Sequence, residues 1–321
     1  KSVCKKKWQD FKSETYHEYR RKWHSSPQKH EVLSFPIHLD LDITNACNLK
    51  CKMCARTIMI EKGNMHDVGF MKLDFVKNLI DQGAENGLFS IKFSFQGEPL
   101  LHPDIVEMVA YAKERGIIDT MFNTNAMLLT EEKAAALLDA GLDNIFFSVD
   151  SIFKERHEAI RPGADYSKIL ENIHNFVKLK NTKKRYDMQV GVNMVVMEEN
   201  KNEVEAFVNQ WSDIVDTVNW GWDHHFVLKK NHKNAASSSI KTHKDFCCSQ
   251  LWQRLIVTWD GQSLPCCLDV ERELVVGNAN NTPLQKIWLQ SPLYKHLRAK
   301  HRSGNFADVE RCRKCSFAIL S

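Results

Sequence analysis

The stretch IHLDLDITNACNLKCKMC, residues 37–54, joins a strand pattern to a group of three cysteines. Its first eight residues alternate apolar and polar side chains, which predicts a β-strand. Cys47, Cys51 and Cys54 follow directly, and three thiolates in a loop at the carboxyl end of a strand suit an iron–sulfur cubane. Three protein ligands leave one iron without a protein donor, so that iron is free to bind an exogenous molecule. The pattern therefore indicates a catalytic metal site.

Two other interpretations of these cysteines are weaker. A structural zinc site normally has four protein ligands, and His66 is the one conceivable fourth ligand close by in the sequence. Disulfide bonds cannot use all three cysteines, because pairing leaves one over. An iron–sulfur cluster is the interpretation that uses every cysteine of the motif.

Downstream of this motif, strand and helix patterns alternate. Six strands interleaved with five helices predict βαβ units and a parallel α/β sheet. Right-handed crossovers curl such a sheet, so we expect a partial (β/α)6 TIM-like barrel, followed by a small C-terminal α+β cluster-binding domain. The expected strands are 37–44, 90–96, 119–124, 144–151, 188–197 and 217–222, and the expected helices are 72–85, 103–115, 130–140, 166–180 and 201–212.

Four segments follow from this pattern. Residues 1–34 form an N-terminal extension, in which Trp8–Trp23 has the spacing of an amphipathic docking helix. Residues 35–228 form the barrel, and 229–246, which are polar and rich in Ala and Ser, form a linker. Residues 247–321 form the cluster-binding domain, with a hairpin around Asp260-Gly261 and a helix over 286–300.

Composition narrows the class of partner and the compartment. Residues 1–30 hold nine Lys and Arg against three Asp and Glu, while the rest of the chain has a slight acidic excess, which argues against a nucleic-acid partner. The sequence shows no apolar run of about 20 residues and no signal peptide, so we expect no membrane association and a cytoplasmic enzyme. The ten cysteines of a cytoplasmic protein are more often metal ligands or catalytic residues than partners in disulfide bonds.

The first cysteine motif resembles the signature of the radical S-adenosylmethionine (SAM) superfamily, Cys-x3-Cys-x2-Cys after the first barrel strand. Further motifs stand in the same order as in that family. Gln96-Gly97-Glu98-Pro99 resembles its Gly-Gly-Glu-Pro motif, with Gln96 in place of the first glycine. The resemblance implies that the sites of SAM binding include Gln96, Gly97, Glu98, Pro99, Asn123, Ser148 and Asp150, and that Arg161 is catalytic.

The resemblance also implies the chemistry. SAM would chelate the open iron of the [4Fe–4S] cluster, and one electron would release methionine and a 5′-deoxyadenosyl radical. The radical would abstract a hydrogen atom from a small-molecule substrate in the barrel mouth. A flavodoxin or ferredoxin would supply the electron.

A second set of cysteines lies near the C-terminus. A hairpin brings Cys248 and Cys266 together, and Cys312 and Cys315 supply another pair, so four thiolates suit a closed cluster or zinc. The spacing Cys248-x12-Gly261-x4-Cys266 resembles the opening of the SPASM domain. Too few cysteines follow for two clusters, so the segment resembles the shortened twitch domain. That resemblance implies one auxiliary [4Fe–4S] cluster on these four cysteines.

Three further residues are candidates for the chemistry. Cys247 and Cys267 adjoin the expected ligands, and either of them could be a small buried hydrophobe or a hydrogen-atom donor. Cys267 is the preferred donor, because it lies at the end of the hairpin nearer the expected barrel mouth. His224 follows the sixth strand and could act as a base or lie on a surface loop. Asp40 and Asp42 alternate on the first strand, and at least one of them should point into the barrel, where a buried carboxylate needs a partner such as Lys92 or Arg161.

The reaction itself stays open between several classes. Enzymes of the twitch type act on small polar molecules, including sugars and aminocyclitols. We expect oxidation of an alcohol carbon, with the auxiliary cluster accepting an electron. The alternatives are an epimerase with a cysteine hydrogen-atom donor, a peptide-modifying maturase, for which the N-terminal helix is too short to bind a leader, and a cluster protein without SAM chemistry. The intact motifs argue against the last.

Overall fold

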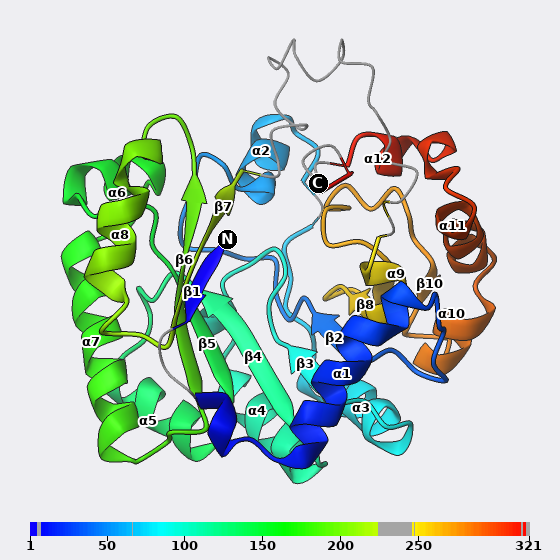
Figure 1. Cartoon of the computed structure of the whole chain (residues 1–321), viewed down its shortest axis with the longest axis horizontal. Helices are drawn as coiled ribbons and strands as arrows, with labels where there is room; N and C mark the ends of the chain where they lie inside the picture. The colour runs from blue at the N-terminus through cyan, green and yellow to red at the C-terminus, as the bar shows by residue number, and fades with distance from the viewer. Residues whose placement is uncertain (5–7, 66, 224–245, 247, 316, 319–321) are drawn as a thin grey trace.

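The computed structural model describes residues 1–4, 8–65, 67–223, 246, 248–315 and 317–318. Within these residues, ten strands form one sheet in the order β1-β7-β6-β5-β4-β3-β2-β8-β9-β10 (Figure 1). Strands β2 to β7 and β8 pair in parallel, whereas β1, β9 and β10 pair antiparallel with their neighbours. The bounds are β1 (Ser2–Cys4), β2 (His38–Leu41), β3 (Ser90–Lys92), β4 (Asp119–Thr124), β5 (Asn144–Ser148), β6 (Gln189–Val196), β7 (Thr217–Trp222), β8 (Arg254–Val257), β9 (Gln262–Leu264) and β10 (Gly277–Asn278).

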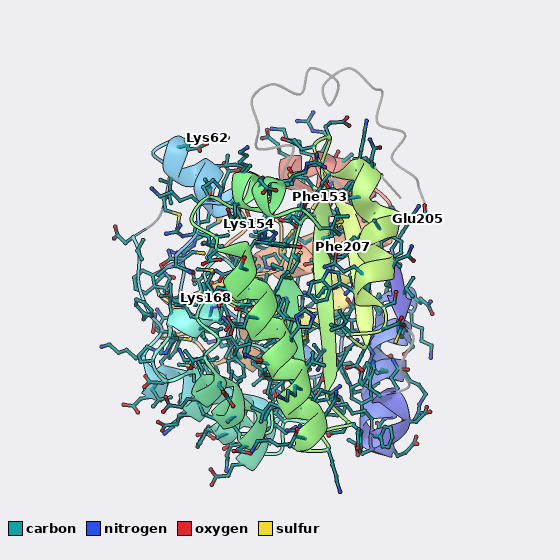
Figure 2. The ribbon with its side chains drawn as sticks, turned by 90° about the vertical axis from the view of Figure 1, so that its left-hand side faces the viewer. Lys62, Phe153, Lys154, Lys168, Glu205 and Phe207 are labelled. Carbon is teal, nitrogen blue, oxygen red and sulfur yellow. The ribbon has the colours of Figure 1, made fainter. Side chains whose placement is uncertain are left out.

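Helices cover the outer face of this curled sheet, so the predicted partial barrel with its α/β alternation is confirmed. In Figure 2, α6, α7 and α8 lie along that face; Phe207 of α8 is buried, whereas Lys168 and Glu205 are exposed. The helices are α1 (Glu14–Gln28), α2 (Ala55–Glu61), α3 (Leu73–Glu85), α4 (Ile105–Glu114), α5 (Glu131–Asp139), α6 (Lys154–Ile160), α7 (Tyr166–Thr182), α8 (Val204–Trp211), α9 (Gln250–Gln253), α10 (Leu284–Gln290), α11 (Pro292–Arg302) and α12 (Glu310–Arg313).

The alternation of side chains along the strands explains the layering. On β2, Leu39 and Leu41 are fully buried in the large core between sheet and helices. His38 and Asp40 occupy the alternate positions and face the opposite side of the sheet, because successive strand residues point to opposite faces. The inner face of the barrel is therefore polar, while its outer face is apolar.

The C-terminal segment differs from the expectation in two ways. Strand β8 pairs in parallel with β2, so the hairpin of β8 and β9 continues the barrel sheet. The prediction of a single helix over 286–300 is wrong, because Ser291 separates two helices, α10 and α11. Pro292 explains the break: proline lacks a backbone N–H and is accepted at the first turn of a helix, where the N–H has no partner inside the helix. The expected linker, 229–246, lies almost wholly outside the described residues.

The N-terminal extension packs across the inner side of the sheet. Tyr16 and Tyr19 of α1 are buried in an aromatic cluster with Trp8, Ile37 and Phe89, and the rings of Tyr19 and Phe89 stack. Strand β1, which the sequence pattern did not predict, adds to β7 in antiparallel register. Figure 1 shows α1 lying in front of the lower parts of β2, β3 and β4.

Candidate active site

The first cysteine loop follows β2, at the carboxyl end of the barrel strands. Two hydrogen bonds hold it against the chain around α6: the N–H of Lys50 donates to the carbonyl of Pro162, and that of Lys52 to the carbonyl of Ile160, both at 3.0 Å. Burial is the main reason that the pKa of Cys47 rises to about 11, and the nearby charges of Glu98, Cys51 and Cys54 add to it. The three thiols thus lie within electrostatic reach of one another, as ligands of one cluster must.

Arg161 joins this loop to the fifth strand. Its Nε donates to the Asp150 carboxylate at 2.6 Å, and another guanidinium nitrogen lies 3.6 Å from the Cys51 sulfur. Asp150 has no exposed surface, and its second oxygen accepts from the N–H of Val195 at 2.8 Å. Although burial opposes the charge, Asp150 and then Cys51 raise the pKa of Arg161 above its ordinary value. Burial raises the pKa of the Cys51 thiol, and the Arg161 cation opposes that rise, so Arg161 favours the thiolate form that an iron ligand needs.

The predicted SAM-binding motif lies beside this loop. A Cβ atom on Gly97 would lie 2.1 Å from the carbonyl oxygen of Thr44, so only glycine fits where these two backbones cross. Glu98 is buried, and its carboxylate accepts from the hydroxyl of Thr124 at 2.7 Å and from the N–H of Asn125 at 2.8 Å. Glu98 therefore fixes the ends of two neighbouring strands. Pro99 begins a short 3-10 helix, η2 (Pro99–Leu101).

Gln96, the departure from the family motif, connects the barrel to the C-terminal segment. Its N–H donates to the buried carboxylate of Asp42 at 2.9 Å, and its side-chain amide donates to the carbonyl of Val270 at 3.1 Å. Burial raises the pKa of Asp42 to about 7. A glycine could not make the second contact, so this position holds the loop around Val270 near the SAM-binding motif.

The remaining predicted SAM contacts lie at the ends of the next strands. The N–H of Asn123 on β4 donates to the hydroxyl of Ser94, two residues after β3, at 3.1 Å. Ser148 is the last residue of β5 and pairs in register with Asn193 of β6. Asn123 and Asn193 both line a cavity inside the barrel. The structure thus brings the predicted motif residues of β2 to β5 to one end of the sheet.

The barrel cavity has a volume of about 430 Å³ and lies between the inner face of the sheet and α1. Polar side chains from many strands line it, which suits a ligand rich in hydroxyl groups. Its polar lining consists of Gln9, Arg20, His38, Lys92, Asp119, Asn123, Asn144, Gln189, Asn193, Asn219 and Arg254, with aromatic surface from Trp8, Tyr16, Tyr19, Trp23 and Phe146.

The buried carboxylate of Asp40 interacts with charged residues that line this cavity. Arg254 donates to its carboxylate at 3.2 Å, and the Lys92 nitrogen lies 3.9 Å away. Although burial opposes ionisation, these cations hold the pKa of Asp40 below its usual range. The expected partner Lys92 is therefore present, but Arg161 is not a partner, because it is bound to Asp150. Arg254 is the partner that the sequence pattern missed, because it lies opposite His38 only once β8 pairs with β2, which no local sequence pattern indicates.

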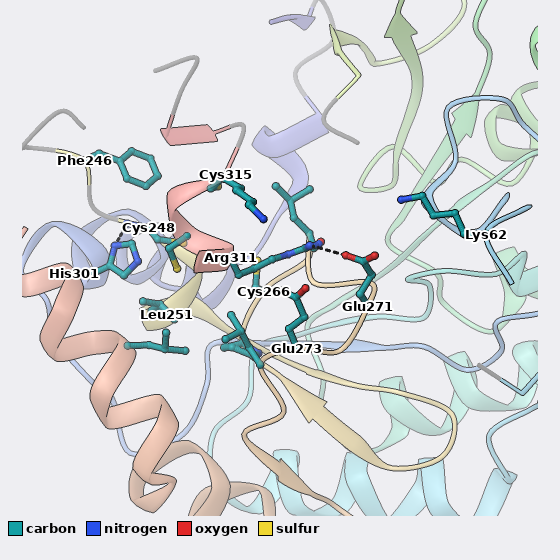
Figure 3. Close-up of a pocket in the computed structure, with 16 residues that line it drawn as sticks. Lys62, Phe246, Cys248, Leu251, Cys266, Glu271, Glu273, His301, Arg311 and Cys315 are labelled. Atoms are coloured by element: carbon teal, nitrogen blue, oxygen red, sulfur yellow. Dashed lines mark hydrogen bonds and ion pairs between the residues drawn. The ribbon is translucent and has the colours of Figure 1, made fainter. Parts of the chain in front are cut away.

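Four predicted cluster ligands line a second pocket. Cys248, Cys266, Cys312 and Cys315 all border a volume of about 170 Å³, together with apolar side chains such as Leu251 (Figure 3). Burial, followed by the charges of Cys315 and Asp269, raises the pKa of Cys312 to about 12. In Figure 3, Arg311 reaches across to Glu271 at 3.1 Å, which ties α12 to the loop after Cys266.

The two remaining candidates differ in what the structure shows. Cys267 accepts from the Gln250 amide at 3.1 Å, and its own N–H donates to the oxygen of the same side chain at 2.9 Å. It does not border the four-cysteine pocket, whereas Arg254, Asp40 and Lys92 act electrostatically on its thiol. Its thiol therefore lies toward these charged residues of the barrel. His224, like Cys247, lies outside the described residues.

The donor sets fit clusters better than single ions. No three His, Cys, Asp or Glu side chains in the described part of the chain gather as they would around one metal ion. In a cubane each cysteine binds a different iron, so the sulfurs stand further apart than around zinc. Both sets consist of cysteine alone, which is the usual donor set of a [4Fe–4S] cluster.

Comparisons with known proteins agree with this geometry. Residues 41–210 match the Radical SAM superfamily, and residues 247–316 match an iron–sulfur cluster-binding domain, SPASM. Curated relatives include GTP 3′,8-cyclase of Alkaliphilus metalliredigens, 32% identical over 54% of this chain and 51% of the relative. A tungsten-containing aldehyde ferredoxin oxidoreductase cofactor-modifying protein of Pyrococcus furiosus is 32% identical over 52% and 46%. The chain spans about half the length of the curated relatives it matches.

Solved structures confirm the fold. BtrN in complex with AdoMet and 2-DOIA superposes with a TM-score of 0.56 at 17% identity, over 88% of this chain and 93% of BtrN. Streptococcus suis SuiB bound to its precursor peptide SuiA gives 0.62 at 18% identity, over 88% and 71%. The family matches confirm the expected cofactors: SAM with a [4Fe–4S] cluster, and an auxiliary iron–sulfur cluster. The chain belongs to the radical SAM superfamily.

Proposed function

We propose that this radical SAM enzyme oxidises an alcohol carbon of a small polar substrate, a sugar or aminocyclitol, bound in the barrel cavity. The observation that carries the proposal is the lining of that cavity. Asn123, Asn193 and Asn219 present amides that can both donate and accept, which match the hydroxyl groups of such a substrate. When bound, the cluster and SAM together supply a 5′-deoxyadenosyl radical that takes a hydrogen atom.

The residues of the barrel end have distinct parts in this proposal. Cys47, Cys51 and Cys54 hold the catalytic cluster, and the Arg161 cation beside Cys51 opposes the effect of burial and so favours the thiolate that binds iron. Gly97 allows the close backbone crossing on which the SAM site rests, and Glu98 fixes its edge. Asn123, Ser148 and Asp150 complete that edge of the SAM site, with Asp150 acting through Arg161.

Oxidation needs an acceptor for one electron and a base for one proton after the hydrogen atom has left. The auxiliary cluster on Cys248, Cys266, Cys312 and Cys315 is the proposed electron acceptor. The proton goes to a base, for which His224 remains the sequence-based prediction. A flavodoxin or ferredoxin is the proposed source of the electron that starts each turnover.

A second candidate function, epimerisation, is favoured by one observation. The Cys267 thiol is near Arg254, Asp40 and Lys92, and two of these three line the cavity. A thiol so placed could return a hydrogen atom to a substrate radical. Peptide modification is a third candidate, because PqqA peptide cyclase of Rhodopseudomonas palustris is 33% identical over 37% of this chain and 30% of the relative.

Anaerobic turnover with reductant and a panel of sugars and aminocyclitols tests the proposal. Substrates deuterated at the alcohol carbon should pass deuterium to 5′-deoxyadenosine, and the product should be lighter by two hydrogens. An isomer of the substrate that gains one deuterium when the unlabelled substrate reacts in D2O would indicate epimerisation instead. Deuterium transfer from a peptide, with none from the sugars, would replace both proposals by peptide modification.

A further inference from the structure

The barrel cavity has two chemically different ends. Asn123 lies four residues beyond Asp119 on β4, which places it about 13 Å further along the strand, toward the cysteine loop. Asp119, His38 and Arg254 line the other end, and Lys92 lines the same end one pair of residues further along β3, at the level of Asp40. A substrate that places its reacting carbon beside the SAM motifs would therefore extend its other end toward these charged groups.

Cations outnumber anions at that lower end. Arg20, Lys92 and Arg254 carry positive charge toward the cavity, while Asp40 and Asp119 are the carboxylates that face them. Asp119 already accepts from Asn144 at 2.5 Å and from Ser90 at 3.2 Å. Burial lowers the pKa of His38, so its ring favours the neutral form. At least one positive charge is left without a counter-charge in this part of the cavity.

One donor there is also without an acceptor. Arg254 donates through one terminal nitrogen to Asp40, but within the described residues its buried Nε atom has no hydrogen-bond partner. A buried donor without a partner costs free energy, since it has given up its bonds to water. Nε itself is closed off from the cavity, but the Arg254 side chain is 19% exposed and lines the cavity, so its positive charge is open to an anion there.

Helix α1 completes this end of the cavity. The Arg20 guanidinium lies 5.3 Å from the Tyr19 ring centre and 5.4 Å from the Trp23 ring centre. The Arg254 guanidinium lies 5.2 Å from the same Trp23 ring centre. The aromatic rings hold both guanidinium groups at the cavity wall. Trp8 and Tyr16 add apolar surface against which a ring substrate can pack.

We propose that the lower end of the cavity binds an anionic oxygen group of the substrate, a phosphate or a carboxylate, through Arg20, Lys92 and Arg254. The N-terminal helix α1 is then a wall of the substrate site as well as a packing element. This inference rests on the proposed function in one respect: it takes the barrel cavity as the substrate site. It narrows the substrate to a sugar or aminocyclitol derivative that carries a negative charge.

Titration calorimetry of the anaerobic holoenzyme with SAM, without reductant, tests the inference with inorganic phosphate and with acetate as probes. Two variants remove cations from the site, Arg20→Gln and Lys92→Met. Arg21→Gln is the matched control, because Arg21 is the next residue on the same helix, has a side chain 64% exposed and pairs with Glu14. Circular dichroism and iron content confirm that each variant is folded and loaded.

We expect saturable binding of one anion by the wild type, weakened about tenfold or more in Arg20→Gln and Lys92→Met and unchanged in Arg21→Gln. Binding of phosphate but not acetate assigns a phosphorylated substrate, and the reverse assigns a carboxylate. Absence of saturable binding of either anion, or equal weakening by Arg21→Gln, would overturn the inference. Because no turnover is involved, these results do not depend on which reaction the enzyme performs.

Discussion

The two cysteine sites of this protein differ in how the chain builds them. The barrel site takes its three thiols from one loop, residues 47–54, whereas the C-terminal site gathers four from three separate places in the chain. Charged groups adjoin the first: Arg161 lies 3.6 Å from the Cys51 sulfur, with Asp150 behind it. Apolar side chains such as Leu251 and Leu297 border the second, and charged ones such as Glu271 and Arg311 stand further round the same pocket.

This difference separates a reacting site from a closed one. A site with three thiolates and a fixed cation leaves room for a charged ligand such as SAM, and polar groups near a cluster tune its potential. A site with four thiolates offers a protein ligand to every iron of a cubane and so has no position for an exogenous ligand, which suits the transfer of electrons. Substitution of one residue in each site tests this difference.

The largest effect should come from Cys51→Ser. Cys51 is the most buried thiol of the loop, 8% exposed, and lies beside Arg161. We expect the rate of reductive SAM cleavage to fall by more than about 10²-fold. That loss exceeds the roughly 10- to 100-fold loss of activity that follows removal of a residue hydrogen-bonded to a metal ligand. Iron should fall from about eight to about four per chain, on the basis of two cubanes. Undiminished 5′-deoxyadenosine formation would show that these cysteines do not hold the catalytic cluster.

Cys312→Ala should separate the two sites. Iron should again fall to about four per chain, but 5′-deoxyadenosine should still form, because the barrel site is intact. Oxidised product should fall by about 10²-fold, since the electron acceptor is lost. If iron content stays unchanged and zinc is found, the second site is structural, and the oxidation proposal loses its acceptor.

Gly97→Ala tests the backbone crossing beside the barrel site. The added methyl group would lie 2.1 Å from the Thr44 carbonyl oxygen, so one strand end must shift. Overpacking of this kind costs about 1–3 kcal/mol, which corresponds to roughly 5- to 150-fold in SAM affinity. Gly221→Ala is the matched control, because its methyl group would meet nothing within 4 Å. Equal SAM binding by both variants would contradict this assignment.

The contrast between the sites also explains what the sequence could predict. The cysteine loop and the strands β4 and β7 depend on local patterns, and the predicted bounds of both strands match those observed. The pairing of Arg254 with Asp40 joins residues 214 positions apart and depends on β8 lying beside β2. No local periodicity carries that information, because it arises only when the C-terminal segment extends the barrel sheet.

The same reason limits what could be said of α1 and Cys267. The spacing of Trp8, Tyr16 and Tyr19 predicted an apolar face, but not which cavity that face would close. The hairpin suggested Cys267 as the free thiol, but its hydrogen bonds to Gln250 depend on α9 packing against it. The break at Ser291 is different, because Pro292 marks it in the sequence itself.

A smaller effect should appear in the pH dependence of stability. The pKa of Asp42 is raised by burial from 3.8 to about 7, so the folded protein favours the protonated carboxyl. The stability that this group contributes is full below about pH 4 and is lost as the pH rises through about 7. Between pH 5 and 8 we expect the free energy of unfolding of the wild type to fall by on the order of 1–3 kcal/mol because of Asp42, and this fall to be absent in Asp42→Asn. Thermal unfolding of the holoenzyme measures it, with the exposed Asp10→Asn as control; parallel pH profiles for all three proteins would contradict the assignment.

The smallest effect is expected at Cys267, and it decides between the two leading reactions. Oxidation needs no hydrogen-atom donor, so Cys267→Ala and Cys267→Ser should change the rate of product formation by less than about threefold. The serine variant keeps a polar partner for Gln250, so agreement between the two variants separates the thiol's chemistry from its packing. Iron content guards against damage to the adjacent ligand Cys266. If both variants still transfer hydrogen to 5′-deoxyadenosine but no longer release product, Cys267 returns a hydrogen atom to the substrate. The enzyme is then an epimerase, and the closed C-terminal site no longer has to accept an electron from the substrate.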